Sequence, residues 1–332
     1  MSTTVIDCRS SLALLALVFQ NTALAIVLNL TFRPDAPPYA PSSAVLSTEL
    51  VKLLISCAVI GSSSNVELWR VIVQLKRNRL LFVPSLLYVV QNNLLFFAAK
   101  RLTPIVYIVC TQTKLLTTAT MSRFILGTVL TTSQCGYLIL LLFGIVMVQV
   151  QGQTLSVTSE ENWGVSDQFL GVMAVLSAAW TSGTAGVVLE KIFKARTNNH
   201  DASDDTTIWT RNAQLSLISL PFAVSGVFLS DYEKVSSGSI FKGYDIFVWS
   251  VILLQAAGGI IIAFVMKFSN NMLKCFAVAI SICCCALYSV ATETLTFTPS
   301  LALGMLLVII SVTGFTSKPK TPTPTDHLPV HK

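Results

Sequence analysis

The chain has 332 residues, of which 53% are hydrophobic and only 11% are charged. Soluble globular domains carry about 25% charged residues, so this composition excludes a soluble domain and indicates a protein that crosses a membrane several times. The net charge of +6 is spread over the ends of the apolar segments, so it bears on orientation in a membrane and does not indicate a nucleic-acid partner.

Ten apolar segments follow one another along the chain. Because a helix needs about 20 residues to cross the hydrocarbon core of a bilayer, we predict an all-α membrane protein with ten transmembrane helices. Their predicted ranges are 11–32, 43–61, 80–99, 103–125, 131–150, 168–190, 208–230, 245–266, 270–291 and 299–316. An even number of crossings places both termini on the same side of the membrane.

Basic residues are concentrated on the side that the termini share. That side carries Arg9, Arg70, Lys76, Arg77, Arg79, Arg123, Lys191, Lys194, Arg196, Lys318 and Lys320, and the opposite side carries Arg33, Lys100, Arg101, Lys234 and Lys242. Cytosolic loops are enriched in Lys and Arg, so we expect both termini to be cytosolic. Residues 318–332 are rich in Pro and Thr and too polar to form a core, and we expect a disordered tail there.

Five helices in each half predict an inverted repeat. A unit with an odd number of helices, repeated in tandem, inserts its second copy upside down, and carriers built in this way bind their substrate between the repeats near the bilayer midplane. We predict repeats at residues 1–150 and 151–317. A shift of 160 residues weakly supports a duplication, because it relates Lys114 to Lys274, Ala119 to Ala279, Gly144 to Gly304 and Val148 to Val308.

Lys114 and Lys274 lie within apolar segments. A charged side chain in hydrocarbon costs about 2.5 to 3.5 kcal/mol on insertion scales, so it normally faces a partner or a polar pathway. Polar residues share a helix face with each lysine: Tyr107, Cys110, Thr111, Thr117 and Thr118 with Lys114, and Lys267, Asn270, Asn271 and Ser281 with Lys274. Two such stripes facing one another would bind an anionic, phosphate-bearing substrate. In the alternative interpretation, the lysines extend to the membrane surface.

Three consecutive amides, Gln91, Asn92 and Asn93, lie in the segment 80–99. Amides in hydrocarbon need partners, which either hydrogen bonds between helices or contact with a substrate supplies. Two structural features are also expected. Glu49 and Lys52 should form an ion pair within one helix, and glycines should allow close helix packing at Gly183, Gly186, Gly258 and Gly259.

The sequence contains little that could support catalysis. Its histidines, His200, His327 and His331, fall in a loop and in the tail, and its eight cysteines lack the spacing of zinc ligands. No nucleophile elbow or phosphate-binding glycine loop is present. We therefore expect a protein that is not an enzyme and that uses neither a metal nor a cofactor.

A series of motifs spans nearly the whole chain: LVFQNTALAIVLNLTFR, STELVKLL, VPSLLYVVQNNLLFFA, the stretch from Tyr107 to Lys114, AGVVLEKIFK, WTRNAQL, FKGYDIFVWSVILLQAAGG and VMKFSNNMLKCFA. In kind and order they resemble the motifs of the nucleotide-sugar transporters of the Golgi and endoplasmic reticulum, in the branch that carries UDP-sugars and CMP-sialic acid. The resemblance implies a drug/metabolite transporter fold and the exchange of a cytosolic nucleotide sugar for a lumenal nucleoside monophosphate.

The resemblance also implies that Tyr107, Lys114, Asn212 and Lys274 line the nucleotide site, and it favours Gln91 and Asn92 by their position in a family motif. The complete substrate-binding set that we predict is Tyr107, Lys114, Lys274, Asn212, Gln91, Asn92, Thr111, Asn271 and Ser281. Departures from the family pattern leave the base and the sugar open. The family usually has a basic pair where this chain reads LGTVLTTSQ, and Tyr-Gln-Leu-Lys where it reads Thr-Gln-Thr-Lys.

We expect UDP-galactose or UDP-N-acetylglucosamine as the substrate rather than CMP-sialic acid, in the Golgi membrane or alternatively that of the endoplasmic reticulum. Two other functions stay open at this point: a carrier of another phosphorylated metabolite, and a transport-inactive scaffold for a glycosyltransferase. Besides the lipid bilayer and the substrates, a second copy of the chain and a glycosyltransferase are the partners left open.

Overall fold

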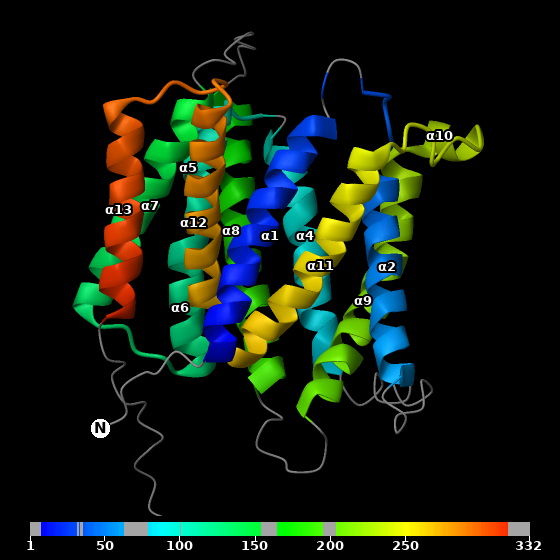
Figure 1. The fold of residues 1–332 in the computed structure, drawn as a ribbon, viewed down its shortest axis with the longest axis horizontal. Helices are drawn as coiled ribbons and strands as arrows, with labels where there is room; N and C mark the ends of the chain where they lie inside the picture. The colour runs from blue at the N-terminus through cyan, green and yellow to red at the C-terminus, as the bar shows by residue number, and fades with distance from the viewer. Residues whose placement is uncertain are drawn as a thin grey trace, which may run out of the picture. The chain divides into compact units, whose positions relative to one another are not determined.

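The computed structural model describes residues 8–31, 33, 36–62, 79–99, 101–153, 165–194 and 204–317. Within these ranges the regular secondary structure is helical throughout (Figure 1), as the predicted all-α class requires. Helices suit a membrane because they satisfy the backbone N–H and C=O groups internally where no water is present. The predicted tail at 318–332 and the three histidines lie outside the described residues.

The helices follow the predicted apolar segments in order. They are α1 (Cys8–Thr31), α2 (Pro41–Ser62), the short 3-10 helix η1 (Arg79–Leu81), α4 (Phe82–Ala99), α5 (Pro104–Gln112), α6 (Lys114–Leu126), α7 (Thr132–Gln153), α8 (Val165–Lys194), α9 (Asp204–Ser230), α10 (Tyr232–Ser236), α11 (Ile246–Phe268), α12 (Asn271–Ala291) and α13 (Pro299–Thr316).

Eight of the described helices are long and apolar enough to cross a membrane: α1, α2, α4, α7, α8, α11, α12 and α13. The protein is therefore a multi-pass membrane protein. The segment predicted at 103–125 is divided into α5, with 9 residues, and α6, with 13 residues, each too short for a full crossing. Helix α9 has 27 residues and begins with the polar sequence DDTTIWTRNAQ.

The chain forms two compact units. Among the described residues, unit 1 comprises 90–191 and 271–317 and contains α5, α6, α7, α12, α13 and most of α8. Unit 2 comprises 8–89 and 192–270 and contains α1, α2, α9, α10 and α11. The division falls within α4, after Val89, and near the end of α8, after Lys191.

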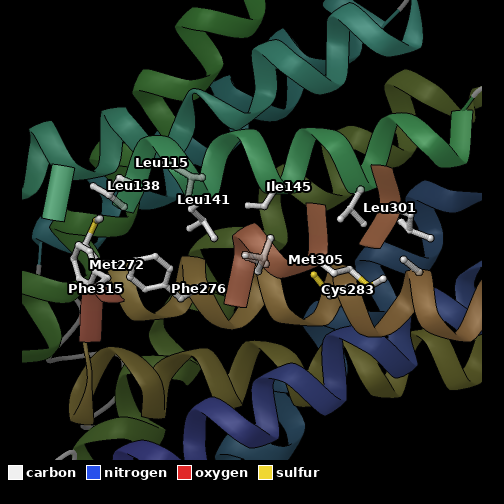
Figure 2. Packing of buried hydrophobic residues seen from close by; sticks show 14 of the residues in the cluster. Leu115, Leu138, Leu141, Ile145, Met272, Phe276, Cys283, Leu301, Met305 and Phe315 are labelled. Carbon is white, nitrogen blue, oxygen red and sulfur yellow. The ribbon is translucent and has the colours of Figure 1, made fainter. Parts of the chain in front are cut away.

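Apolar side chains from α6, α7, α12 and α13 form the core of unit 1 (Figure 2). Leu141 of α7 and Leu301 of α13 are fully buried there, and the rings of Phe276 and Phe315 pack with their centroids 4.6 Å apart. Lipid tails are as apolar as these side chains, so close van der Waals packing, rather than exclusion from water, favours contact between membrane helices.

Helices α7 and α13 approach one another closely at two glycines. A Cβ atom added to Gly144 would lie 2.9 Å from the carbonyl oxygen of Gly304, and one added to Gly304 would lie 3.1 Å from that of Gly144. The flanking contacts are reciprocal as well, because Gly144 meets Val308 and Gly304 meets Val148, each at 3.0 Å. The two glycines, and likewise the two valines, are pairs related by the 160-residue shift.

Polar side chains join the same two helices on either side of the glycines. Ser311 Oγ donates a hydrogen bond to the backbone carbonyl of Tyr137 at 2.5 Å. Toward the other end of α7, Gln151 Nε2 donates to Ser300 Oγ at 2.8 Å. Gln151 and Ser311 are again 160 positions apart in the sequence, so corresponding residues of α7 and α13 each bond to the opposite helix.

Unit 2 packs α1 against α11 and α2 against α9. Gln20 of α1 donates to a backbone carbonyl of α11 at 3.0 Å and lies against Gly258, and Lys52 of α2 lies against Gly259. Lys52 Nζ is 2.7 Å from Glu49 Oε1. The expected ion pair and the packing role of these two glycines are therefore confirmed.

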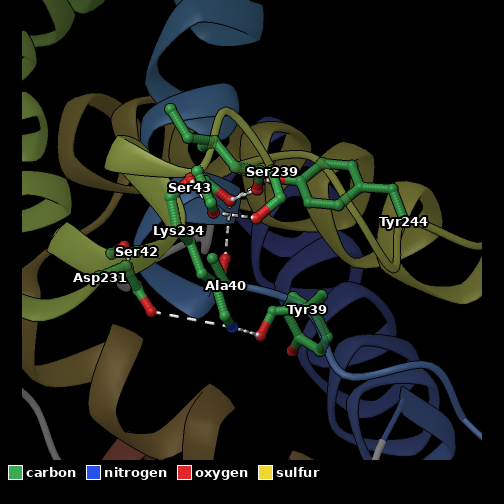
Figure 3. A network of polar contacts seen from close by, with 10 residues as sticks. Tyr39, Ala40, Ser42, Ser43, Asp231, Lys234, Ser239 and Tyr244 are labelled. Carbon is green, nitrogen blue, oxygen red and sulfur yellow. Dashed lines mark hydrogen bonds and ion pairs between the residues drawn. The ribbon is translucent and has the colours of Figure 1, made fainter.

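A polar network joins the start of α2 to α10 and to the segment before α11 (Figure 3). Ser43 Oγ and the hydroxyl of Tyr244 share a hydrogen bond of 2.8 Å, and Lys234 Nζ donates to the backbone carbonyl of Tyr39 at 3.0 Å. The hydroxyl of Ser42, in the first turn of α2, donates to the carboxylate of Asp231. A negative charge near a helix N-terminus is favourable, so this network fixes where α2 begins.

Gly144→Ala should lower the thermal unfolding temperature of the detergent-solubilised protein. The added methyl group meets the backbone of α13, and overpacking of this kind costs about 1–3 kcal/mol. Gly136→Ala on the same helix is the matched control, since no atom lies within 4 Å of its Cβ position and Ala is favoured over Gly in a helix by up to about 1 kcal/mol. Equal unfolding temperatures for the two variants would contradict the close contact.

Candidate functional site

The helical segment that carries Lys114 is interrupted one residue before it. Helix α5 ends at Gln112, and α6 begins at Lys114. Between them, the backbone N–H of Thr113 donates to the carbonyl of Cys110, three residues back, at 3.2 Å. The hydroxyl of Thr113 donates to the same carbonyl at 2.6 Å. A single tighter turn within a helix often marks a functional position.

Unit 1 contains a chamber of about 270 Å³ beside this interruption. Its polar wall consists of Gln112, Lys114, Thr118, Gln149, Ser182, Asn271, Lys274 and Cys275. Its apolar wall consists of Leu115, Ile145, Val278, Ala279 and Ile282. These residues come from the end of α5 and from α6, α7, α8 and α12. Leu115 and Ile145 also belong to the core in Figure 2, so the chamber adjoins this core.

Lys114 and Lys274 line this one chamber. No Asp or Glu is among the residues that line it, and within the described part of the chain neither lysine forms an ion pair. Two ammonium groups in a region of low dielectric repel one another, and an anion between them lowers the energy of both. The geometry therefore favours a ligand-binding role for these lysines over an extension to the membrane surface.

A pair of glutamines lies in the same wall and was missed by the sequence analysis. Gln112 Nε2 donates to Gln149 Oε1 at 2.6 Å. Gln112 is buried and Gln149 is half-buried. The sequence did contain a sign of this pair, because both residues carry amides inside apolar segments and Gln112 is two residues before Lys114. Spacing along the chain, however, does not reveal that α5 and α7 bring them together.

The start of α12 is fixed by contacts with α8. The backbone N–H of Asn271 donates to Glu190 Oε2 at 2.8 Å, so a buried carboxylate satisfies one of the N–H groups that the first turn of a helix leaves open. Gly186 lies directly against the amide of Asn271, and Gly183 against Thr117. The predicted close packing at these two glycines is confirmed. It positions the first turn of α12, where Lys274 lines the chamber.

The structure brings three of the predicted site residues together, namely Lys114, Lys274 and Asn271. Three others on the same helices do not line the chamber. Tyr107 packs against the cluster that includes Ala98 and Val175. The hydroxyls of Thr111 and Ser281 donate to backbone carbonyls of their own helices at 2.7 Å.

The remaining predicted site residues lie on α4 and α9. Gln91 is half-buried and Asn92 is exposed on α4, in the part of that helix that belongs to unit 1, and neither lines the chamber. Asn212 is buried on α9, in unit 2.

One polar stripe predicted from the sequence is wrong. The face from Lys267 through Lys274 to Ser281 assumed a single helix, but α11 ends at Phe268 and α12 begins at Asn271. Ser269, between them, has φ −129° and ψ −139°, which is outside the helical region. Lys267 and Asn270 therefore do not share a helix face with Lys274.

A multi-pass helical membrane protein with two lysines in one chamber has the features of a membrane transporter of anionic solutes. More specifically, the chain belongs to the nucleotide-sugar transporter family, whose model matches residues 8–316.

Relatives support this membership over most of the chain. The UDP-N-acetylglucosamine/UDP-N-acetylgalactosamine transporter nstp-4 of Caenorhabditis elegans is 37% identical over 288 residues, which is 82% of each chain. The UDP-galactose transporter of Schizosaccharomyces pombe is 34% identical over 324 residues, which is 94% of this chain and 89% of the relative. One solved crystal structure aligns with a TM-score of 0.66 over 93% of this chain and 97% of its own, at 13% identity. At that identity the likeness concerns the fold alone.

Glu190→Ala should lower the unfolding temperature, because it leaves the buried N–H of Asn271 without its acceptor. An unsatisfied buried donor costs about 1–3 kcal/mol. Glu190→Gln keeps an acceptor oxygen and should recover most of the loss. Lys191→Ala changes the exposed neighbouring residue and is the control. Thermal unfolding of the three purified variants measures the effect. If the unfolding temperature of Glu190→Ala equals that of the wild-type protein, the bond from Asn271 N–H to Glu190 does not stabilise the start of α12.

Proposed function

We propose that this protein is an antiporter that moves a cytosolic UDP-sugar into the Golgi lumen in exchange for UMP. The observation that carries the proposal is the pair of lysines, Lys114 and Lys274, in one chamber without an acidic partner among its lining residues. Phosphate oxygens form strong charge-assisted hydrogen bonds with ammonium groups. Nucleotide sugar and nucleoside monophosphate share the phosphate that such a chamber selects.

Exchange follows from the cost of an empty chamber. When the substrate leaves, the two ammonium groups face one another in a region where charge is poorly screened. Carrying that arrangement through an occluded state is unfavourable, whereas carrying it with a bound anion is not. The return step is therefore fast only when a second phosphate-bearing ligand has bound, which couples entry of the sugar nucleotide to exit of the monophosphate.

We further propose ten membrane crossings in two inverted repeats, at residues 1–150 and 151–317. In this arrangement α5 and α6 form one interrupted crossing, and α9 forms another beside the eight apolar helices. The reciprocal contacts of Gly144 with Val308 and of Gly304 with Val148 support the repeat. They are the contacts expected where a two-fold axis passes between α7 and α13.

The proposed orientation has both termini in the cytosol, on the side where basic residues are concentrated. The Golgi membrane is the proposed location and the endoplasmic reticulum membrane is the alternative, because the motifs resemble those of nucleotide-sugar transporters of both organelles. The remaining predicted contacts, Tyr107, Thr111, Gln91, Asn92, Asn212 and Ser281, are proposals that rest on the same motifs.

Among UDP-sugars, we propose an N-acetylhexosamine nucleotide, UDP-N-acetylglucosamine, as the first substrate to test. The nematode relative is named for UDP-N-acetylglucosamine and UDP-N-acetylgalactosamine, and the fission-yeast relative for UDP-galactose. The uridine diphosphate is common to all three. UDP-galactose is therefore the first comparison substrate.

Uptake of labelled UDP-N-acetylglucosamine into proteoliposomes preloaded with UMP tests the proposal. Preloading should stimulate uptake, and Lys114→Ala and Lys274→Ala should each reduce it by about tenfold or more. The reason is that a hydrogen bond to a charged group contributes about 1.5–3 kcal/mol, and 1.4 kcal/mol is tenfold in binding. Lys242→Ala changes a lysine exposed outside the chamber and should leave uptake unchanged.

Four results would overturn the proposal. Uptake that does not respond to preloaded UMP would rule out exchange. Normal uptake by a folded Lys114→Ala variant would make that lysine structural. Stronger competition by an unrelated phosphorylated metabolite than by UMP would indicate a different solute, and no uptake of any nucleotide sugar would favour a transport-inactive scaffold.

A further inference from the structure

The chamber holds a second chemical feature besides its two cations. Gln112 at the end of α5 and Gln149 on α7 are joined by a hydrogen bond of 2.6 Å, and both line the chamber. One amide hydrogen and one carbonyl oxygen are used in this bond. The other two groups of the pair, Gln112 Oε1 and the Nε2 hydrogens of Gln149, are the ones that a ligand could reach.

These two groups have no hydrogen-bond partner within the described part of the chain. Neither group is fully enclosed by protein atoms, and both residues line the chamber. Exchanging the oxygen and nitrogen of both amides gives the same result, because a joined pair always leaves one carbonyl oxygen and one whole NH₂ group free. A polar group in an apolar surrounding is costly without a partner, so the pair favours a ligand that brings a donor and an acceptor.

We propose that Gln112 and Gln149 form a subsite for the acetamido group of an N-acetylhexosamine nucleotide. The acetamido N–H donates to the free oxygen of Gln112, and its carbonyl oxygen accepts from the free NH₂ of Gln149. The inference rests on the proposed transport function and deepens it, because it names residues that contact the sugar rather than its phosphates.

The position of the pair favours the acetamido group over the uracil ring. In these substrates the acetamido group is on C2, next to the carbon that carries the phosphate oxygen, whereas the whole ribose separates uracil from its phosphate. The chamber that contains both glutamines and both lysines has a volume of only about 270 Å³, smaller than a typical pocket for a whole ligand of about 300–1,000 Å³. A group close to the phosphates therefore fits there better than a distant one.

The experiment measures how well unlabelled nucleotides compete with labelled UMP for uptake into UMP-loaded proteoliposomes. For the wild-type protein, UDP-N-acetylglucosamine and UDP-N-acetylgalactosamine should compete better than UDP-glucose and UDP-galactose. In Gln149→Leu and Gln112→Leu, competition by the two N-acetylated nucleotides should weaken about tenfold, which is the loss expected for one or two hydrogen bonds. Competition by UDP-glucose, UDP-galactose and UMP should not change.

Gln151→Leu is the matched control. It removes the same side chain two residues along α7, but Gln151 bonds to Ser300 of α13 and does not line the chamber. Its competition profile should equal that of the wild-type protein. If either chamber variant does not fold, the wild-type comparison decides, because equal competition by N-acetylated and plain UDP-sugars refutes an acetamido subsite.

Other outcomes also overturn the inference while leaving the transport proposal intact. If the glutamine variants weaken competition by all UDP-sugars equally, the glutamines maintain the structure of the chamber and do not recognise the acetamido group. If the glutamine variants change the preference between UMP and CMP, the glutamines contact the base of the nucleotide. Failure of the transport proposal itself is distinct, because it appears as wild-type protein that exchanges no nucleotide sugar for UMP.

Discussion

The chamber depends on an electrostatic constraint, namely that two ammonium groups are kept in a membrane protein without an acid beside them. Lys52 has Glu49 at 2.7 Å on its own helix, and such a pair lowers the cost of both charges in an apolar surrounding. Lys114 and Lys274 have no such partner among the residues that line their chamber. Their charge is thus available to a ligand, and the surrounding helices must be rigid enough to keep the two lysines from separating.

That rigidity comes from the packing of unit 1. Helix α12 carries Lys274 and packs against α6, α7 and α13, and Leu115, next to Lys114, is buried in the same core. The core residues have little freedom to move because the glycines of α7 and α13 bring the two backbones into contact. On the other side, Glu190 and Gly186 of α8 fix the first turn of α12. Local backbone geometry, core packing and the charge of the site are therefore linked.

The apolar segments and the two lysines were predictable because both signals are strong in a single sequence. A segment of about 20 apolar residues has few alternatives to a membrane helix, and a lysine within it is conspicuous. The glutamines were not recognised, since an amide in hydrocarbon serves helix contacts as readily as ligands. The predicted stripe from Lys267 to Ser281 was wrong because the chain leaves the helix at Ser269. Neither Gly nor Pro marks this break in the sequence. The interruption at Thr113 likewise falls in a sequence without Gly or Pro, so periodicity does not reveal it.

Helices α7 and α13 are held at three levels: by Ser311 and Tyr137 toward one end, by the two glycines between, and by Gln151 and Ser300 toward the other end. Sliding of one helix along the other would break all three contacts, and tilting about the glycines would break the two hydrogen bonds at the ends. Helices α7 and α13 therefore move as one rigid unit, which is called the strut below. Movement within unit 1 has to occur around this strut instead, and the 3-10 turn at Thr113 between α5 and α6 provides a joint. A transport cycle built on this unit would then move Gln112, on the α5 side of this turn, while Lys114 on α6 and Gln149 on α7 stay in place.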